Sequence, residues 1–254
     1  SGALLMMPVF CKDYGLKGIW FAIFHSISAF CNAGFDVLGT ADNQFASMTT
    51  YACNPVINIT LMLLIVIGGI GFVTWEDIEN NKYHFKRYKM QSKLIIVTKA
   101  VLITVPAIIF MINDMMTGNE KMPVFKALFQ SVTLRTAGFN TVDLNAMKQA
   151  SVMIMIILML IGGSPGSTAG GMKTTTFAVL MGNKNIHFFE RRIDNDTVKN
   201  AATIAMMYIT LFVTGAFIIN VTDGISLGKC LFETASAVGT VGLTLGITPQ
   251  LRIL

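Results

Sequence analysis

The sequence predicts an all-α integral membrane protein made of repeated units, each with two membrane spans and a short re-entrant helix between them. Of its 254 residues, 53% are hydrophobic and only 13% are charged, whereas a soluble domain carries about 25% charged residues. Its uncharged runs reach the roughly 20 residues that a helix needs to cross a bilayer. A short motif of polar residues and glycine also recurs between these runs.

Four runs are long enough to be membrane spans: residues 56–75, 94–113, 151–180 and 201–221. Lys99 lies near the start of the second run, so we expect its side chain to snorkel to the membrane interface. Lys173 lies deep in the third run and is therefore a functional candidate. We expect it to face a cavity or bind a backbone carbonyl; the alternative is a lysine that snorkels toward the cytoplasmic surface.

Three shorter stretches, residues 16–30, 124–134 and 227–238, match re-entrant half-helices because they cannot cross a bilayer. The linkers 80–93 and 183–199 hold five and four Lys/Arg residues. The positive-inside rule places these linkers in the cytoplasm. The segments around 36–48, 114–122 and 222–229, together with the half-helices, are then expected to face outside.

The half-helices carry an internal repeat: Phe, a polar residue, Ser/Thr, any small or apolar residue, Ser/Thr, and then a glycine before a large apolar residue. Gly34, Gly138 and Gly242 close the three copies at equal intervals of 104 residues. Parallel repeats of this kind predict an arrangement around a central ion pore. Backbone carbonyls of such loops replace the hydration shell of a cation, and glycine permits the positive φ that turns a carbonyl inward.

The third span is interrupted by residues 162–171, which contain five glycines and a proline. Such a segment cannot stay helical, and irregular backbone inside a membrane survives only where protein buries it or where it lines a water-filled cavity. We therefore expect it beneath the pore loops. Residues 166–174 also resemble a phosphate-binding loop, but they follow an apolar helix instead of the β-strand that such a loop requires.

Other residue patterns limit the function. The four Cys residues lack the C-x-x-C spacing of a zinc site, and no nucleophile, base or paired-carboxylate set indicates an enzyme. The basic residues cluster in the linkers without aromatic neighbours, which favours membrane lipid as a partner over nucleic acid.

Arg135, before the second pore loop, is expected at the outer mouth, bound to carbonyls or to Glu233. His25, Gln130 and Glu233 occupy equivalent positions and are expected to be scaffold contacts.

The repeat glycines and the interrupted span resemble the Trk/Ktr/HKT superfamily of potassium transporters, and most closely the pore-forming subunits of bacterial Ktr systems. The resemblance covers essentially the whole chain. Its carriers are the segments SAFCNAGFD (28–36), RTAGFNT (135–141), GGSPGSTAGGMKT (162–174) and GTVGLT (239–244).

The resemblance implies four span–half-helix–span repeats around one potassium pathway, of which this chain carries repeats two to four. Residues 1–90 would be the end of the first span, the pore loop and the second span of repeat two. Residues 91–182 would form repeat three with its gate, and 183–254 would be a cytosolic linker followed by the first span and pore loop of repeat four. Repeat one and the last span are expected to be absent. The implied selectivity filter comprises Asn32, Ala33, Gly34, Phe35, Thr136, Ala137, Gly138, Phe139, Thr240, Val241, Gly242 and Leu243. The implied gate comprises Gly162, Gly163, Ser164, Pro165, Gly166, Ser167, Thr168, Ala169, Gly170, Gly171 and Lys173.

The resemblance also implies potassium uptake across a bacterial plasma membrane, with no cofactor in this chain. Its implied partners are a second copy of the pore subunit, giving a homodimer, and a cytosolic nucleotide-binding regulatory ring of the KtrA type. Sodium stays open as a coupling or activating ion, and a sodium-selective or sodium/potassium-symporting relative is the nearest alternative. A membrane enzyme or an ATP-driven pump component is the remote one.

Overall fold

The computed structural model describes residues 1–40, 46–116, 124–181, 187–188, 191–192 and 195–251. Three segments to which the sequence assigns a side of the membrane, residues 36–48, 114–122 and 183–199, lie partly outside these ranges. Their orientation stays a prediction.

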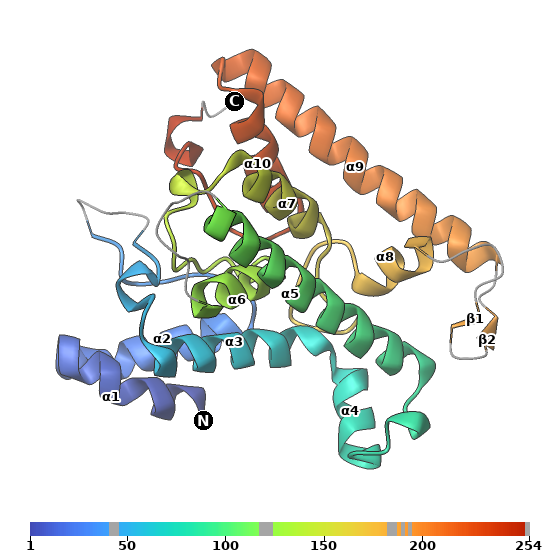
Figure 1. The fold of residues 1–254 in the computed structure, drawn as a ribbon, viewed down its shortest axis with the longest axis horizontal. Helices are drawn as coiled ribbons and strands as arrows, with labels where there is room; N and C mark the ends of the chain where they lie inside the picture. Colours follow the sequence, from blue (N-terminus) through green and yellow to red (C-terminus); the bar gives the residue numbers. More distant parts are fainter. Residues whose placement is uncertain (41–45, 117–123, 182–186, 189–190, 193–194, 252–254) are drawn as a thin grey trace.

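The described residues are almost entirely helical, as predicted (Figure 1). A pair of two-residue antiparallel strands, β1 (His187–Phe188) and β2 (Arg191–Arg192), is the exception. Single 3₁₀ turns occur at Thr49–Tyr51, Phe85–Arg87, Leu144–Ala146 and Thr248–Gln250. The α-helices, in chain order, are α1 (Gly2–Tyr14), α2 (Lys17–Phe30), α3 (Pro55–Ile70), α4 (Phe72–Asn81), α5 (Met90–Met116), α6 (Val124–Thr133), α7 (Gln149–Leu160), α8 (Thr174–Met181), α9 (Asn195–Asp223) and α10 (Leu227–Val238).

Two of the four predicted spans are single helices long and apolar enough to cross a membrane: Met90–Asn113 in α5 and all of α9. The predicted third span, residues 151–180, consists of α7 and α8 with the expected interruption between them. The prediction of a continuous span at residues 56–75 is wrong. The chain bends by 98° between α3 and α4, and α4 projects away from the rest of the fold (Figure 1).

Gly71 causes this bend, because its φ of 99° is open to glycine and strained for other residues. The glycine-rich interruption occupies the inside of the corner: the Phe72 amide donates to the Gly166 carbonyl at 2.9 Å. A Cβ on Gly71 would lie 2.6 Å from the Pro165 carbonyl oxygen. The sequence did not reveal the bend because it depends on this tertiary contact.

The three short helices begin and end close to the residues predicted for them, and each packs against two other helices. Helix α2 contacts α1 and α3, α6 contacts α5 and α3, and α10 contacts α9 and α7. The C-terminal end of each short helix leads into a predicted pore loop.

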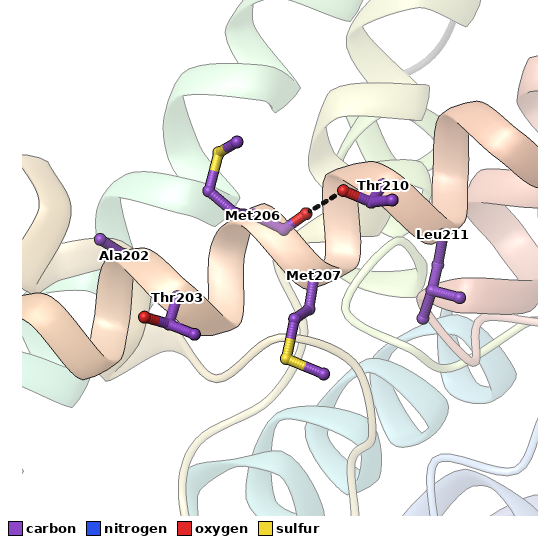
Figure 2. Close-up of a pocket in the computed structure, with 6 residues that line it drawn as sticks. All are labelled: Ala202, Thr203, Met206, Met207, Thr210 and Leu211. Carbon is purple, nitrogen blue, oxygen red and sulfur yellow. Dashed lines mark hydrogen bonds between the residues drawn. The ribbon is translucent and has the colours of Figure 1, made fainter.

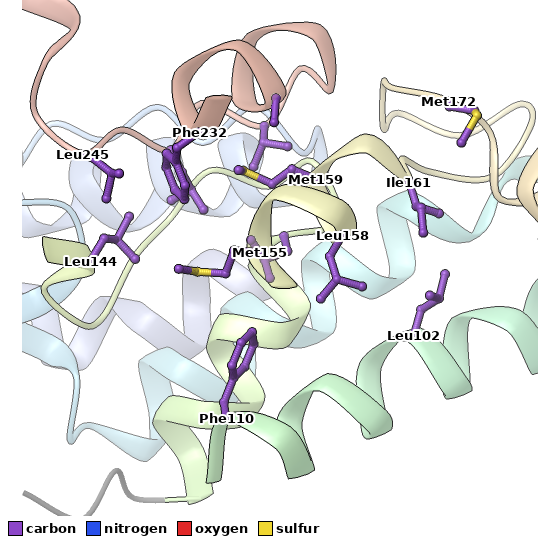
Figure 3. Packing of buried hydrophobic residues seen from close by; sticks show 14 of the residues in the cluster. Leu102, Phe110, Leu144, Met155, Leu158, Met159, Ile161, Met172, Phe232 and Leu245 are labelled. Atoms are coloured by element: carbon purple, nitrogen blue, oxygen red, sulfur yellow. The ribbon is translucent and has the colours of Figure 1, made fainter. Parts of the chain in front are cut away.

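Two apolar clusters hold these helices together. One cluster surrounds α1, α2 and α3 and includes the fully buried Phe10 and Phe129. The other joins α5, α7 and α10, where Phe110, Met155 and Phe232 are fully buried (Figure 3). Because lipid tails are as apolar as these side chains, close van der Waals packing is the main driving force for helix association inside a membrane.

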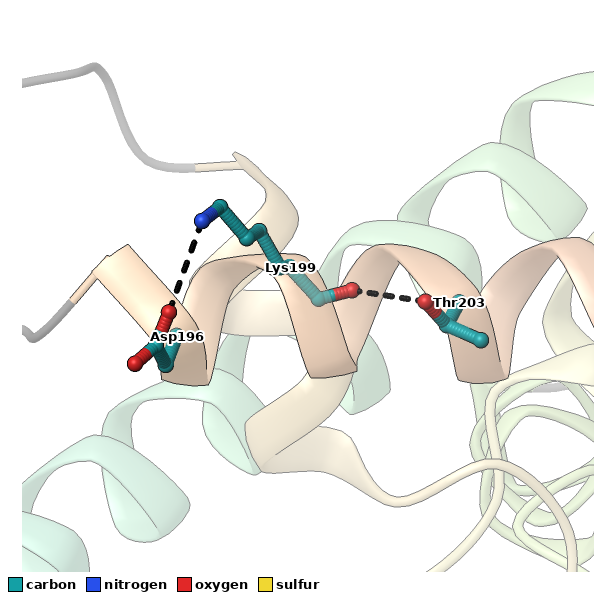
Figure 4. Close-up of polar contacts among 3 residues, drawn as sticks. All are labelled: Asp196, Lys199 and Thr203. Atoms are coloured by element: carbon teal, nitrogen blue, oxygen red, sulfur yellow. Dashed lines mark hydrogen bonds and ion pairs between the residues drawn. The ribbon is translucent and has the colours of Figure 1, made fainter.

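Helix α9 is the most exposed of the predicted spans, with 11% of its most apolar window buried. A groove on its surface is lined by Ala202, Thr203, Met206, Met207, Thr210 and Leu211 (Figure 2). Thr210 donates its hydroxyl to the Met206 carbonyl at 2.8 Å, and Thr203 donates to the Lys199 carbonyl at 3.0 Å (Figure 4). These bonds satisfy threonine hydroxyls on an apolar surface. The Lys199–Asp196 ion pair is exposed and contributes little to stability.

Candidate functional site

The C-terminal ends of α2, α6 and α10 share one hydrogen-bond pattern. The amide of Ala33 donates to the Ser28 carbonyl, that of Ala137 to Thr133, and that of Val241 to Ser236, all at 2.8–2.9 Å. Each bond joins the residue before a repeat glycine to the second Ser/Thr of the repeat motif. The sequence repeat is therefore also a repeat of local structure.

The second Ser/Thr of each motif also holds the loop that follows through its hydroxyl. Ser28 donates to the Phe35 carbonyl at 2.8 Å, and Thr133 donates to the Phe139 carbonyl. In the third copy the direction reverses, because the Gly242 amide donates to the Ser236 hydroxyl at 3.1 Å. The hydroxyl thus fixes the loop at or next to its glycine in every copy.

Each loop adopts a backbone conformation with two positive φ angles, one at the glycine and one two residues before it. The glycine angles are 72°, 78° and 89° at Gly34, Gly138 and Gly242. The earlier positions hold non-glycine residues with φ of 50°, 67° and 54°: Asn32, Thr136 and Thr240. Strain of this kind persists only where the surroundings determine it, and it is typical of functional loops. Six of the twelve predicted filter residues, two in each loop, therefore have a positive φ.

The structure brings the three repeat glycines together at one place. A Cβ on Gly34 would lie 2.5 Å from the Ala137 carbonyl oxygen and 2.8 Å from the Gly138 Cα. A Cβ on Gly138 would overlap the Val241 carbonyl oxygen and lie 3.1 Å from the Gly34 Cα. The three loops therefore meet backbone to backbone, and at Gly34 and Gly138 the approach leaves no room for a side chain.

His25 and Glu233 make contacts of the expected scaffold kind, each to the chain that follows its own loop. The His25 Nε2 accepts from the Val37 amide at 3.4 Å, and its ring stacks on Phe10. Glu233 accepts from the Leu245 amide at 2.9 Å and from the hydroxyls of Thr244 and Thr248. Gln130, at the equivalent position in α6, instead contacts the Met155 sulfur.

Replacing Glu233 by Ala should destabilise the third loop, because it leaves a buried amide and two hydroxyls without their acceptor. Hydrogen bonds to charged groups contribute about 1.5–3 kcal/mol each. We expect the full-length protein to lose at least that amount in a thermal unfolding experiment in detergent. Lys229→Ala, on the exposed side of the same helix, is the control, and equal stability of the two variants would contradict the scaffold role.

The glycine-rich interruption is an ordered loop whose backbone is satisfied by protein. Its ends pair through Gly162 and Met172, and Gly163 both donates to the Gly170 carbonyl and accepts from the Thr174 amide. Its middle is attached to α3, where the Gly69 carbonyl accepts from the Ser164 amide and the Gly68 carbonyl from Thr168, both at 3.3 Å. Irregular backbone in a membrane requires this kind of satisfaction.

This loop lies directly against the pore-loop residues. A Cβ on Gly170 would overlap the Thr240 side chain, and a Cβ on Gly171 would lie 2.9 Å from the Gly239 carbonyl oxygen. On another side, the Thr168 hydroxyl donates to the Phe30 carbonyl at the end of α2, at 2.9 Å. The predicted gate therefore contacts the third predicted filter loop, at Thr240, and the end of the helix that leads into the first.

Two cationic residues near this loop bind backbone carbonyls. Lys173 binds the Ala169 carbonyl at 2.9 Å, as the sequence led us to expect. For Arg135 the sequence left carbonyls and Glu233 open as partners, and the structure shows a carbonyl. Arg135 is 3% exposed and donates to the Ile161 carbonyl at the start of the glycine-rich loop, at 3.1 Å. It therefore connects the second pore loop to the predicted gate.

Lys99 was also interpreted incorrectly from the sequence, because it does not reach the interface. Its side chain is 5% exposed and turns into the protein beside Gly69. The signal was present in the sequence: Lys99 falls four residues after Ile95 and three before Leu102, and these three residues share the buried face of α5. Its distance from the end of the span was a poorer guide than its position around the helix.

In the part of the chain that the structure describes, no group of three or more His, Cys, Asp or Glu residues is placed to hold a metal ion.

Comparison with known proteins identifies the family, because a family model described as a cation transport protein, TrkH, matches residues 8–254. The chain belongs to the TrkH family. It is 37% identical, over its whole length, to the potassium/sodium uptake protein NtpJ of Enterococcus hirae. Over 92% of its length it is 35% identical to the Ktr system potassium uptake protein B of Vibrio alginolyticus, and over 98% it is 32% identical to the protein of the same name from Bacillus subtilis.

Among solved structures, the potassium transporter TrkH of Vibrio parahaemolyticus matches 98% of this chain with a TM-score of 0.71 and 21% sequence identity. This match shows that the TrkH fold is present. The chain spans 58%, 53% and 58% of the three sequence relatives and 56% of the solved chain. Because the chain belongs to a family of ion transporters, the alternative of a membrane enzyme is excluded.

Proposed function

We propose that this member of the TrkH family takes part in potassium uptake across the plasma membrane of a bacterium. In this proposal, potassium loses water at the three meeting loops and then passes the glycine-rich loop beneath them. The observation that carries the proposal is the close approach of Gly34, Gly138 and Gly242, with positive φ at each. The printed names of the relatives, which describe potassium uptake, support the same ion.

The filter in this proposal consists of residues 32–35, 136–139 and 240–243, and the gate of residues 162–171 with Lys173. The contact of Gly170 with Thr240 supports a gate that acts on the filter from below. The boundaries at residues 90 and 182 between the three repeats are part of the same proposal. The proposal also includes a homodimer, surrounding lipid and a cytosolic nucleotide-binding ring. Two relatives are named as parts of a Ktr system, which supports a partner subunit.

Sodium is the second candidate as transported or coupling ion. Two observations favour keeping it: one relative is named a potassium/sodium uptake protein, and the first loop carries Asn32 where the other two carry Thr136 and Thr240. Because Asn32 carries an amide where the other two loops carry hydroxyls, the three equivalent positions do not offer the same groups to an ion.

Rubidium uptake into proteoliposomes that contain the full-length protein tests the proposal. We expect saturable uptake that potassium suppresses at much lower concentrations than sodium does. Sodium that competes as well as potassium would favour the second candidate. Absence of uptake, with and without the cytosolic partner, would contradict a transport function.

A further inference from the structure

Arg135 joins three segments to which the proposed pathway gives separate tasks. It lies just after α6 and directly before Thr136, whose φ of 67° begins the second pore loop. Its carbonyl accepts from the side-chain amide of Asn32 at 3.2 Å, and Asn32 has the equivalent positive φ, 50°, in the first pore loop. Its guanidinium Nη1 donates to the Ile161 carbonyl at 3.1 Å. The backbone of Arg135 therefore holds two pore loops, while its side chain holds the glycine-rich loop.

Ile161 lies at the stem of the glycine-rich loop, where both ends of the loop meet. It caps the C-terminus of α7 and forms an isolated parallel bridge with Met172. The amide of Gly162, the next residue, donates to the Met172 carbonyl at 2.7 Å. Movement of this stem therefore either displaces Arg135 or breaks its bond to the Ile161 carbonyl.

The link through Arg135 is buried along its whole length. The exposed fractions are 6% for Asn32, 3% for Arg135 and 4% for Ile161. A buried hydrogen bond is costly to leave unmade, and one from a charged donor is about twice as strong as a neutral one. A guanidinium also keeps its charge at any physiological pH. The contact between the side chain and the stem therefore persists unless the stem itself moves.

Two other contacts connect the glycine-rich loop with the pore, and they reach different segments. Thr168 binds the Phe30 carbonyl at the end of α2, before the first pore loop. Gly170 packs against Thr240 of the third pore loop. Of the three connections, only the one through Arg135 reaches the second pore loop.

We propose that Arg135 is a positioning residue that couples the glycine-rich loop to the filter. Ion binding at the filter holds the backbone of Arg135 in place and thereby stabilises the loop, and movement of the loop changes the ion preference of the filter. This inference rests on the proposed function, because it takes residues 32–35 and 136–139 as filter and residues 162–171 as gate. Coupling of this kind is reciprocal for binding and typically changes affinity by about fivefold or more.

Hydrogen exchange of the full-length protein in detergent tests the coupling without a transport assay. Exchange is compared in rubidium chloride and in choline chloride by mass spectrometry. The amides of Gly163 and Thr174 are hydrogen-bonded within the glycine-rich loop, so their exchange reports local opening of the loop. Residues 240–244, in the third pore loop, report whether rubidium binds. In the wild type, rubidium should slow exchange at residues 240–244, and by about fivefold at residues 162–174.

Arg135→Gln should keep the rubidium effect at residues 240–244 and reduce the effect at residues 162–174 to about twofold or less. Arg135→Lys keeps a charged donor and should give an intermediate response. Arg87→Gln, which removes an exposed arginine, is the control and should behave as the wild type. A purely structural Arg135 would lower the Tm when replaced but would leave the rubidium effect at residues 162–174 unchanged.

Two results would overturn the coupling alone. One is a wild type in which rubidium slows exchange at residues 240–244 and not at residues 162–174, a comparison that needs no variant. The other is a folded Arg135→Gln variant whose response at residues 162–174 equals that of the wild type. If rubidium slows exchange in none of the three pore loops of the wild type, the proposed filter fails and the coupling fails with it.

Rubidium uptake into proteoliposomes provides an independent measurement. The substitution Lys173→Met, which releases the Ala169 carbonyl inside the loop, is made in the wild type and in Arg135→Gln. In the wild-type background it should change the sodium concentration that halves uptake by about fivefold, and in Arg135→Gln by about twofold or less. Equal changes in the two backgrounds would contradict the coupling.

Discussion

Replacing Gly138 by Ser should reduce the preference of the full-length protein for potassium over sodium by about tenfold or more. Gly138 has a φ of 78°, which costs a non-glycine residue about 1–2 kcal/mol. Its new Cβ would also overlap the Val241 carbonyl oxygen, so the third loop must move. A loss of 1.4 kcal/mol in relative ion binding corresponds to a factor of ten.

The relevant measurement is the sodium concentration that halves rubidium uptake, compared across matched glycine variants. Gly242→Ser has similar backbone strain, but its new Cβ would make only an ordinary van der Waals contact, with the Gly138 Cα at 3.9 Å. It should have a smaller effect. Gly224→Ser, with a φ of 65° and no atom near its Cβ, should leave ion preference unchanged. Unchanged preference in Gly138→Ser would remove Gly138 from the filter.

Replacing Lys173 by Met should increase uptake, by up to about tenfold. The Lys173 ammonium fastens the glycine-rich loop by binding the Ala169 carbonyl, next to Gly170, which contacts Thr240. A hydrogen bond to a charged group contributes about 1.5–3 kcal/mol, less here because the side chain is half-buried. If this bond holds the loop closed, its loss shifts the loop toward the open state.

Initial rates of rubidium uptake at equal protein content test this second expectation. Lys173→Arg keeps a donor and should stay near the wild-type rate. Thr168→Val removes the separate bond to the Phe30 carbonyl and should also raise the rate. If well-folded Lys173→Met and Thr168→Val both transport at the wild-type rate or below it, the loop is not a gate.

The sequence was a good guide wherever local chemistry decides the conformation. The three short helices follow from runs too short for a bilayer, and the positive φ angles at Gly34, Gly138 and Gly242 follow from a repeat in which the same Ser/Thr positions hold each loop. Likewise, the five glycines and the proline of residues 162–171 are incompatible with a helix.

The errors arose where contacts between distant segments decide the outcome. The bend at Gly71 could not be predicted, because Gly68 and Gly69 just before it stay helical and the sequence does not show that the Gly166 carbonyl accepts from the Phe72 amide. For Arg135, carbonyls and Glu233 were both left open as partners, and only the structure shows that the partner is the Ile161 carbonyl, 26 residues along the chain. The buried position of Lys99 follows from the face of α5 that it shares with Ile95 and Leu102, whereas its distance from the helix end predicts an exposed side chain.

Anomalous scattering from rubidium in crystals of the full-length protein tests the central claim most directly. That claim is that the three loops, meeting at Gly34, Gly138 and Gly242, form the binding site for the transported ion. We predict a rubidium peak at the level of these glycines, bounded by backbone oxygens of all three loops, and a weakened peak when sodium replaces rubidium in excess. Rubidium bound elsewhere, with none at this level, would contradict the account.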